Sequence, residues 1–379
     1  RVRGSIIRPM ISSLFSPVTL RNCELKNRVI AAPPPSHLAE PDGRVTASML
    51  DYYHNLADTD AGMVIVEAAA VSAEGRSWQK QLSLFRPETI SGLSRLVEKI
   101  RNRGALPVAQ LYHGGINAIP GLNQTVYGAG QPRIKRISAS IVAMNKEKIA
   151  QVFSEYAAAA KLAWNAGFSG IEIQAAGSAL PHQFLSPITN TRHDDYAFET
   201  GGGDRFLQQL VRTVKQAVPD LLLFVCMPLR DLLPAGYGLS NAIKTAQSIK
   251  SEGVELFRVT EGLKFGNPLL LHPALDKTAP DAPFSDDTHI FRNETRFLTV
   301  LSGKVSTPQV ALNRLKNGTA DFVALGRTLN REPLWLGGRL ATDLLPWQRC
   351  LRCAICKAAS DGCPDREGLN RWLIIQNAK

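Results

Sequence analysis

Short apolar runs alternate with helical patterns eight times along the chain, and few folds accommodate such an alternation. Runs of this kind, bounded by turn-forming residues, are typical of buried parallel strands. With a helix after each strand, they close into a barrel more readily than they form an open sheet. The sequence therefore predicts an α/β fold, a (β/α)8 TIM barrel, with strands at residues 29–35, 63–71, 106–113, 170–174, 221–227, 256–260, 297–303 and 322–326.

Helical patterns cover residues 146–166 and 204–218. Two more helices are expected to begin at Thr307 and Glu332, because each is followed by Pro, which favours the first helical position. The segment 114–145 is long and rich in Gly and Pro. In a barrel, such a segment is usually a lid or an excursion near the active site.

Charge and hydropathy exclude several classes of function. The net charge of +11 over 379 residues is high, but basic residues cluster only at 133–136 and in the first eight residues. This scatter indicates a solvated surface rather than a nucleic-acid site. No run is long enough for a membrane span, and no signal peptide is recognisable. We expect a cytoplasmic enzyme with a small-molecule substrate and with no nucleic-acid or membrane partner; residues 1–12 are read as a disordered tail or a cloning remnant.

The strand at 170–174 runs directly into small and polar residues at Gln174, Gly177 and Ser178. The carboxyl ends of barrel strands form the face that carries the active site. The run that follows resembles the old yellow enzyme family of flavin oxidoreductases, whose fourth strand ends in His-x-x-His or His-x-x-Asn before a QFLSP–N–R–D–Y pattern. The residues that carry the resemblance are Gln183, Phe184, Leu185, Ser186, Pro187, Asn190, Arg192, Asp194 and Tyr196.

The resemblance implies FMN as the cofactor, since the segment LFSPVTLRNCELKNRVIAAPPP also matches the opening of that family. By this match Pro33 and Pro34 flank the flavin ring, and Ala68 occupies the flavin position of the second strand. Gln110 occupies that of the third strand, and its amide has the chemistry to pair with a flavin carbonyl and ring N–H. The alternative for Gln110 is an amide satisfied within the core.

The phosphate of FMN is expected at the ends of the last two strands, at Gly303 and at Gly326 with Arg327. Barrels often bind phosphate there, because glycine lets backbone N–H groups approach and arginine supplies charge. The stretch LSGKVSTPQVALNRLKNGTADFVALGRTL resembles the phosphate half of the family, although Ser302 replaces its first Gly. The alternative for Gly303 is an ordinary turn.

The chain departs from the family where relatives hold the substrate. Gln174 and Gly177 stand in place of the two histidines, and Ala179 in place of a tyrosine. A pocket without an imidazole and a phenol stabilises a developing enolate less well. Ordinary cyclic enones are therefore expected to be poor substrates.

A second departure concerns charge near the flavin. Cys226 occupies the place of the arginine that ends the fifth strand in the family, where positive charge favours the reduced flavin anion. Arg230, four residues later, and Arg258, on the neighbouring strand, are the available replacements. We assign Arg258 to the cofactor site.

Two residues are expected to take part in catalysis. His37 follows the Pro-rich turn of the first strand, and an imidazole there can exchange a proton near neutral pH. Gln174 still offers one neutral hydrogen-bond donor. The alternative for His37 is a surface-loop histidine. Glu172 lies two residues before Gln174 on the same strand, and we expect it to be a paired carboxylate inside the barrel.

Four of the six cysteines form a compact cluster near the C-terminus: Cys350, Cys353, Cys356 and Cys363. Such spacing does not suit a disulfide framework in a large enzyme and favours thiolate ligands. The cluster resembles the [4Fe-4S] site of trimethylamine dehydrogenase and, less closely, of 2,4-dienoyl-CoA reductase. The shorter gap before Cys363 leaves zinc or free thiols as alternatives.

The sequence therefore predicts an FMN-binding barrel over residues 13–345 and a Cys-rich segment over 346–379. The expected enzyme moves a hydride between a substrate carbon and the flavin, and its cluster relays electrons to an external carrier or reductase. A homo-oligomer, or a hetero-oligomer with a related barrel, is expected. The alternative is a catalytically degenerate paralogue that serves as a structural partner of an active homologue.

Overall fold

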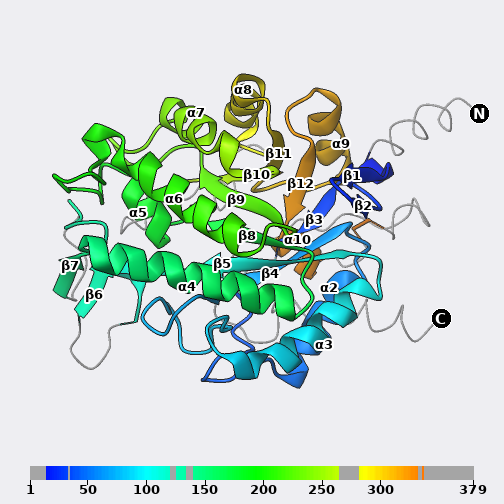
Figure 1. Cartoon of the computed structure of the whole chain (residues 1–379). Coiled ribbons are helices and arrows are strands. Elements are labelled where there is room, and N and C mark those ends of the chain that lie inside the picture. The colour runs from blue at the N-terminus through cyan, green and yellow to red at the C-terminus, as the bar shows by residue number, and fades with distance from the viewer. Residues whose placement is uncertain are drawn as a thin grey trace, which may run out of the picture.

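Eight parallel strands close into a barrel in the computed structural model, which describes residues 14–32, 35–119, 125–133, 140–263, 281–331 and 335–336. The predicted (β/α)8 barrel is thereby confirmed (Figure 1). Around the barrel the strands are β3 (Val29–Ala31), β4 (Met63–Ala70), β5 (Leu106–Tyr112), β8 (Gly170–Gln174), β9 (Leu222–Pro228), β10 (Leu256–Thr260), β11 (Leu298–Ser302) and β12 (Phe322–Leu325).

The predicted strand boundaries hold best where the chain is most regular. Strands β8 and β10 match the prediction at both ends, and all the others except β3 differ by one residue at one or both ends. The first strand ends at Ala31 rather than at residue 35. Residues 33–35 are prolines, which lack the N–H that a strand ladder requires, so the sequence itself explains the early end.

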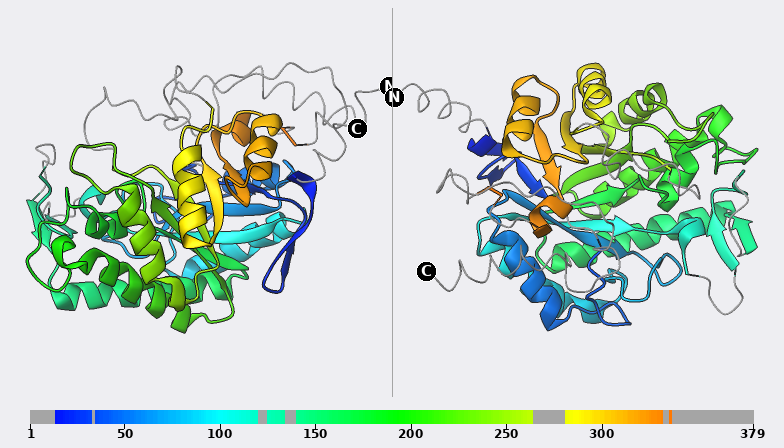
Figure 2. Two further views of the ribbon diagram at one scale, coloured as in Figure 1. Left: turned by 90° about the horizontal axis from the view of Figure 1, so that it is seen from above. Right: turned by 180° about the vertical axis from the view of Figure 1, so that it is seen from behind.

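Helices cover the outside of the barrel in all views (Figures 1 and 2). Thr307 caps α9 through a hydrogen bond that its hydroxyl accepts from Val310 N, as the Thr-Pro pair predicts. The expected start near Glu332 and the tail at residues 1–12 lie outside the described residues. The helices are α2 (Ala47–Ala57), α3 (Ile90–Arg101), α4 (Lys146–Asn165), α5 (Leu180–Leu185), α6 (Gly202–Ala217), α7 (Leu239–Ser248), α8 (Ser285–Thr295), α9 (Pro308–Lys316) and α10 (Arg327–Arg331).

The interior of the barrel changes from apolar to polar along its axis. Because strand side chains alternate with a period of two, every second residue faces inward. The lower layers are apolar and include Ile30, Ile65, Val108 and Phe224. One step toward the carboxyl ends, the same faces carry polar residues, among them Glu67, Gln110, Glu172, Cys226, Arg258 and Ser302.

Two small sheets lie at opposite ends of the barrel (Figure 1). The antiparallel pair β1 (Val18–Leu20) and β2 (Cys23–Leu25) places Leu20 and Leu25 in the apolar cluster of the interior, and so plugs the amino end. The parallel pair β6 (Thr125–Gly128) and β7 (Ser140–Ala143) lies within the segment predicted as a loop after the third strand. That excursion is therefore partly ordered by its own backbone hydrogen bonds.

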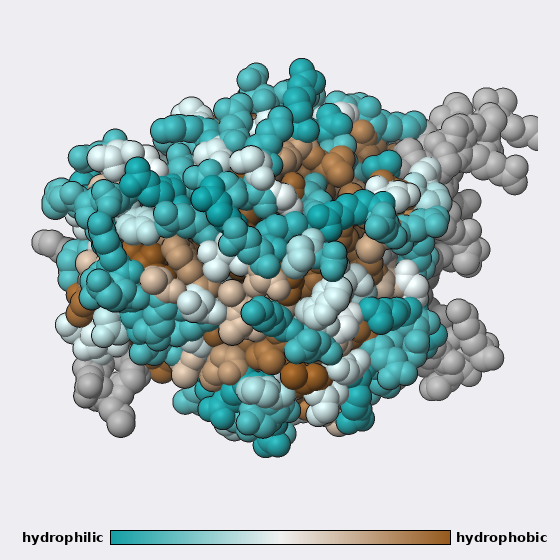
Figure 3. Space-filling view, viewed as in Figure 1, coloured by the Kyte–Doolittle hydropathy of each residue, from teal (hydrophilic) through white to brown (hydrophobic). Residues whose placement is uncertain are grey.

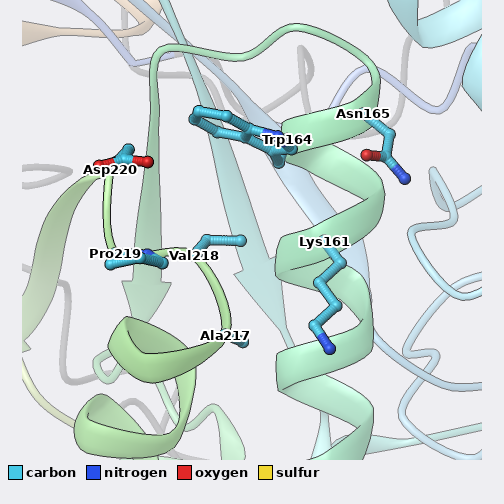
Figure 4. A pocket seen from close by; sticks show the side chains of 7 residues that line it. All are labelled: Lys161, Trp164, Asn165, Ala217, Val218, Pro219 and Asp220. Atoms are coloured by element: carbon cyan, nitrogen blue, oxygen red, sulfur yellow. The ribbon is translucent and has the colours of Figure 1, made fainter.

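A shallow cavity of about 330 Å³ lies at the amino end of the barrel, away from the polar layer. Figure 4 shows Trp164, at the end of α4, pointing toward the loop at Pro219 and Asp220 that precedes β9. Since barrel active sites lie at the carboxyl ends of the strands, this cavity is not the candidate site. The face in Figure 3 is largely hydrophilic, and none of the described helices is long and apolar enough to cross a membrane.

The β1–β2 plug yields a prediction about stability. Leu25→Ala removes a fully buried side chain from the cluster that fills the barrel and should lower the free energy of unfolding by about 2–5 kcal/mol. Glu24→Ala, on the exposed side of the same strand, should change it by less than about 0.5 kcal/mol. Urea unfolding of both variants makes the comparison, and equal effects would show that the hairpin does not seal the interior.

Candidate active site

Polar side chains from three strands meet at the carboxyl end of the barrel, which we call its mouth. Arg258 of β10 donates two hydrogen bonds to Glu172 of β8, from Nε to Oε2 and from a terminal nitrogen to Oε1, both at 2.7 Å. Gln110 of β5 donates through Nε2 to Glu172 Oε1 at 2.5 Å and to Gln174 Oε1 at 3.2 Å. Glu172 is thus the paired carboxylate that the sequence predicted, and its side chain is only 1% exposed.

Arg258 reaches Glu172 across the intervening strand β9. The strand register places Arg258 beside Cys226, and Cys226 beside Gln174. Burial raises the pKa of the Cys226 thiol to about 12, so this side chain is neutral at ordinary pH. The mouth therefore contains a guanidinium that is supplied by β10 and not by β9.

Arg230, the other candidate for this charge, does not lie in the mouth. Its side chain is 49% exposed and forms an ion pair with Asp287 at 2.5 Å. Asp287 belongs to the first turn of α8, on the outside of the barrel. The structure therefore places only Arg258 of these two arginines beside the polar layer.

The loop after β8 is held in an uncommon conformation. Gly177 and Ser178 have φ angles of 62° and 71°, a region that L side chains rarely adopt. Ser178 N donates to His182 Nδ1 at 3.2 Å, so the proton of this imidazole is on Nε2, which lies 3.0 Å from Asp231 Oδ1. The buried His182–Asp231 pair therefore fixes the loop, which agrees with a structural role for this histidine.

Gln174 is engaged within the protein rather than free in the mouth. Its Nε2 donates to Ala176 O at 3.3 Å, while its Oε1 accepts from Gln110. A Cβ on Gly177 would lie 3.7 Å from Gln174 Nε2, so the space beside this amide admits a side chain although the backbone angle disfavours one. The two positions are adjacent, but only one carries a hydrogen-bonding side chain.

The loop after β3 is held in place by hydrogen bonds that involve residues of β4 and α2. Ser36 N donates to Glu67 Oε2 at 2.9 Å, and Tyr53 OH donates to the same oxygen at 3.3 Å. Tyr53 OH also accepts from Glu67 N at 2.7 Å. The next residue, His37, is half-buried with a φ of 56°. Burial raises the pKa of Glu67 to about 7, although these hydrogen bonds act in the opposite direction.

The ends of β11 and β12 lie side by side, since Ser302 pairs with Ala324 in the strand register. Gly303 has a φ of 95°, and α10 begins at Arg327, next to Gly326. Thr328 Oγ1 donates to Val305 O at 3.4 Å and so ties α10 to the loop after β11. Ser302 Oγ is buried and has no hydrogen-bond partner within the described ranges.

Residues 13–342 match the sequence model of the NADH:flavin oxidoreductase / NADH oxidase family. The chain belongs to this family. The NADPH dehydrogenase of Bacillus subtilis (strain 168) is 31% identical over 327 residues, which cover 86% of this chain and 94% of that protein. The family is the one that the QFLSP–N–R–D–Y pattern predicted, and the protein is an FMN-dependent oxidoreductase of the old yellow enzyme type.

Two solved structures share the fold at low identity. The old yellow enzyme homologue from Zymomonas mobilis aligns with a TM-score of 0.74 and 23% identity, over 89% of this chain and 94% of that one. A 2-naphthoyl-CoA reductase aligns with a TM-score of 0.85 and 21% identity, over 96% of this chain. This chain spans 58% of the length of that reductase. At these identities the likeness shows the fold alone.

The described residues fit FMN. Gln110 uses its Nε2 inside the protein, which leaves the carbonyl oxygen of its side chain as the group that can accept from a flavin N–H. The unpartnered Ser302 Oγ and the left-handed Gly303 lie at the end of β11, where the resemblance predicts the phosphate. Ala68, near the end of β4, is small and almost fully buried, in one cluster with Tyr112 and Ala179.

Several predicted site residues lie outside the described residues: Pro33, Pro34, Cys350, Cys353, Cys356 and Cys363. Within the described ranges no group of three or more His, Cys, Asp or Glu residues could hold a metal ion. The iron–sulfur assignment therefore stays a prediction. The alternative of a non-catalytic paralogue finds no support among the relatives, which include the NADPH dehydrogenase.

Sequence reasoning missed an aromatic wall beside the mouth. Trp78 packs against Tyr112, with ring centroids 5.6 Å apart, and against His37 at 5.9 Å. Trp78 and Tyr112 also adjoin the buried pair Ala68 and Ala179. A tryptophan two residues after the Gly75–Arg76 turn that follows β4 was the available signal, because loops at this end of a barrel carry the functional side chains.

The buried ion pair can be tested by a double-mutant cycle. Glu172→Gln and Arg258→Met each leave one charge without its partner and should each lower the free energy of unfolding by about 3–5 kcal/mol. The double variant leaves no unpaired charge and should lose at least about 2 kcal/mol less than the sum of the single variants. Urea unfolding at pH 7 measures all three.

The exposed pair Arg212–Glu252 supplies the control for this cycle. The Arg212 side chain is 49% exposed, and Arg212→Met should therefore cost no more than about 1 kcal/mol. Additive losses at Glu172 and Arg258 would contradict the assignment of a coupled, buried pair.

The raised pKa of Glu67 predicts a dependence of stability on pH. Below about 4.5, its ordinary value, Glu67 is protonated in both the folded and the unfolded protein. Between 4.5 and 7 only the unfolded protein releases this proton, so the contribution of Glu67 to stability is lost as pH rises. The Gln of Glu67→Gln cannot ionise. The free energy of unfolding of this variant should therefore rise, relative to that of the wild type, by on the order of 3 kcal/mol between pH 4.5 and 7.

Urea unfolding of both proteins between pH 4.5 and 7.5 measures this difference. Glu98→Gln, at an exposed position on α3, is the control. The difference in free energy of unfolding between this variant and the wild type should stay constant with pH. A constant gap between Glu67→Gln and the wild type would show that Glu67 titrates normally.

Proposed function

We propose that this protein moves a hydride between a substrate carbon and FMN in the mouth of the barrel, with a reduced nicotinamide as one source of the hydride. The observation that carries the proposal is the polar layer of Gln110, Glu172 and Arg258. It lies beside the paired carboxyl ends of β11 and β12, where the phosphate of FMN is expected. A relative with 31% identity along almost its whole length is an NADPH dehydrogenase, which supports NADPH as the donor. Bound FMN supplies the hydride acceptor and donor of the reaction.

Each residue of the layer has a proposed task. Arg258 places a positive charge beside the flavin, where it favours the reduced anion. Glu172 holds the Arg258 guanidinium in one orientation through two hydrogen bonds. Gln110 orients the flavin ring through its side-chain carbonyl. Gly303, Gly326 and Arg327 bind the phosphate through backbone N–H groups and a guanidinium.

His37 is the proposed acid or base. Its loop is fixed by the hydrogen bond from Ser36 N to Glu67, and its ring packs on Trp78 at the edge of the mouth. When the hydride reaches one carbon of a polarised double bond, the neighbouring carbon takes a proton, which an imidazole can supply near neutral pH. Gln174 acts through its hydrogen bond with Gln110, and so positions the group that meets the flavin.

We also propose that the Cys-rich segment at residues 346–379 holds a metal cluster. Cys350, Cys353, Cys356 and Cys363 would hold a [4Fe-4S] cluster, as the resemblance to trimethylamine dehydrogenase implies, and such a cluster would supply single-electron transfer to an external carrier. Four reduced thiolates persist in a reducing compartment, which supports a cytoplasmic location. A zinc ion is the alternative at the same ligands.

The flavin site is tested with purified protein. FMN should bind at one per chain, and NADPH should bleach its visible absorption under anaerobic conditions. Arg327→Ala removes a charge-assisted contact worth about 1.5–3 kcal/mol and should weaken FMN binding tenfold or more. Lys316→Ala, an exposed position on α9, is the control and should leave the affinity unchanged. Protein that binds no FMN would refute the proposed function.

The metal site is tested by elemental analysis of protein purified without oxygen. About four irons per chain are expected for one [4Fe-4S] cluster, and Cys353→Ser should lose most of them because the thiolates bind cooperatively. Cys23→Ser, on the β2 strand, is the control and should retain the iron. One zinc per chain without iron would replace the electron relay by a structural site.

A further inference from the structure

The aromatic wall contains a hydrogen-bond donor that the protein does not use. Trp78 Nε1 is buried and has no hydrogen-bond partner among the described residues. An indole N–H can only donate, and in the interior of a protein nearly every such donor is paired. An unpaired donor at the edge of an active-site mouth is therefore a candidate for ligand recognition.

The segment that carries Trp78 is held to the end of β4 by hydrogen bonds of its neighbours. Ser77 N donates to Gln81 Oε1 at 2.8 Å, and Gln81 Nε2 donates to Ala68 O at 3.0 Å, at the carboxyl end of β4. Ser77 Oγ lies 3.0 Å from Tyr112 OH, so the phenol is satisfied within the wall. The indole N–H of Trp78 is thus left as the unpaired donor of this wall.

The wall also defines the shape of a ligand. Trp78 and Tyr112 pack in one cluster with the small side chains of Ala68 and Ala179, and the His37 ring meets the Trp78 ring edge to face. Aromatic rings pack best against other flat rings, in offset or edge-to-face arrangements. Ala179 stands where the family has a tyrosine, so this chain has lost a phenol donor on one side of the mouth and has an indole donor on another.

We infer that Trp78 Nε1 donates a hydrogen bond to the carbonyl oxygen of a flat aromatic ketone or aldehyde that stacks in this wall. The inference rests on the proposed function, because it takes the mouth of the barrel as the substrate site. It assigns to Trp78 the role of polarising the carbonyl that Gln174, engaged with Gln110 and Ala176, does not perform.

Binding without turnover tests the assignment. Oxidised, FMN-loaded protein is titrated without reductant with 1-indanone and with indane, which has the same rings but no acceptor. Trp78→Phe keeps an aromatic ring and removes the donor, so it should weaken 1-indanone binding about fivefold to tenfold and change indane binding by less than twofold. Trp164→Phe makes the same change at an exposed tryptophan near the amino end of the barrel, and this control should leave both affinities unchanged.

Trp78→Leu provides a second variant without the donor, and bound FMN per chain shows that each variant is folded. Equal effects of Trp78→Phe and Trp78→Leu on both ligands, or no effect on 1-indanone, would overturn the inference. The titrations are repeated on flavin-free protein, so that the two proposals fail separately. Wild-type protein that binds no FMN refutes the oxidoreductase proposal, whereas a lost distinction between the two ligands in the wild type refutes the role of Trp78.

Discussion

The bidentate ion pair between Arg258 and Glu172 is the contact on which the mouth of this barrel depends. Both groups are taken out of water, and such a transfer is costly unless the charges are paired and their remaining lone pairs are satisfied. Glu172 meets this condition because Gln110 donates to the oxygen that also accepts from a terminal nitrogen of Arg258. The same carboxylate thus orients a guanidinium and an amide, which are the two groups assigned to the flavin ring.

Much of this arrangement follows from the alternation of side chains along strands. Leu256 lies in the apolar interior, and Arg258, two residues later, must face the same way. The same reasoning places Gln110 above Val108, so the polar layer could be predicted as a layer. The sequence assigned Arg258 rather than Arg230 to the cofactor site without a physical reason, because the difference depends on the reach of a side chain across β9 and on Asp287, which engages Arg230.

Other features of the site depend on contacts between segments far apart in the sequence. The raised pKa of Glu67 requires that Tyr53, from α2, and the loop at Ser36 bury it together. A sequence pattern records the carboxylate but not its degree of burial. Trp78 was overlooked for the same reason, since a tryptophan in a loop shows neither its neighbours nor an unpaired N–H until the loop is placed beside Tyr112.

Three residues beside the same mouth have a strained backbone. His37, Ser178 and Lys304, which follow β3, β8 and β11, all have positive φ angles although none is glycine. Each such residue costs on the order of 1–3 kcal/mol and persists only where other contacts hold it. Ser178 is held by His182, and the residue before His37 by Glu67. The buried groups beneath the mouth therefore offset the strain of the loops above it, so the stability of the barrel and the geometry of the candidate site rest on the same hydrogen bonds.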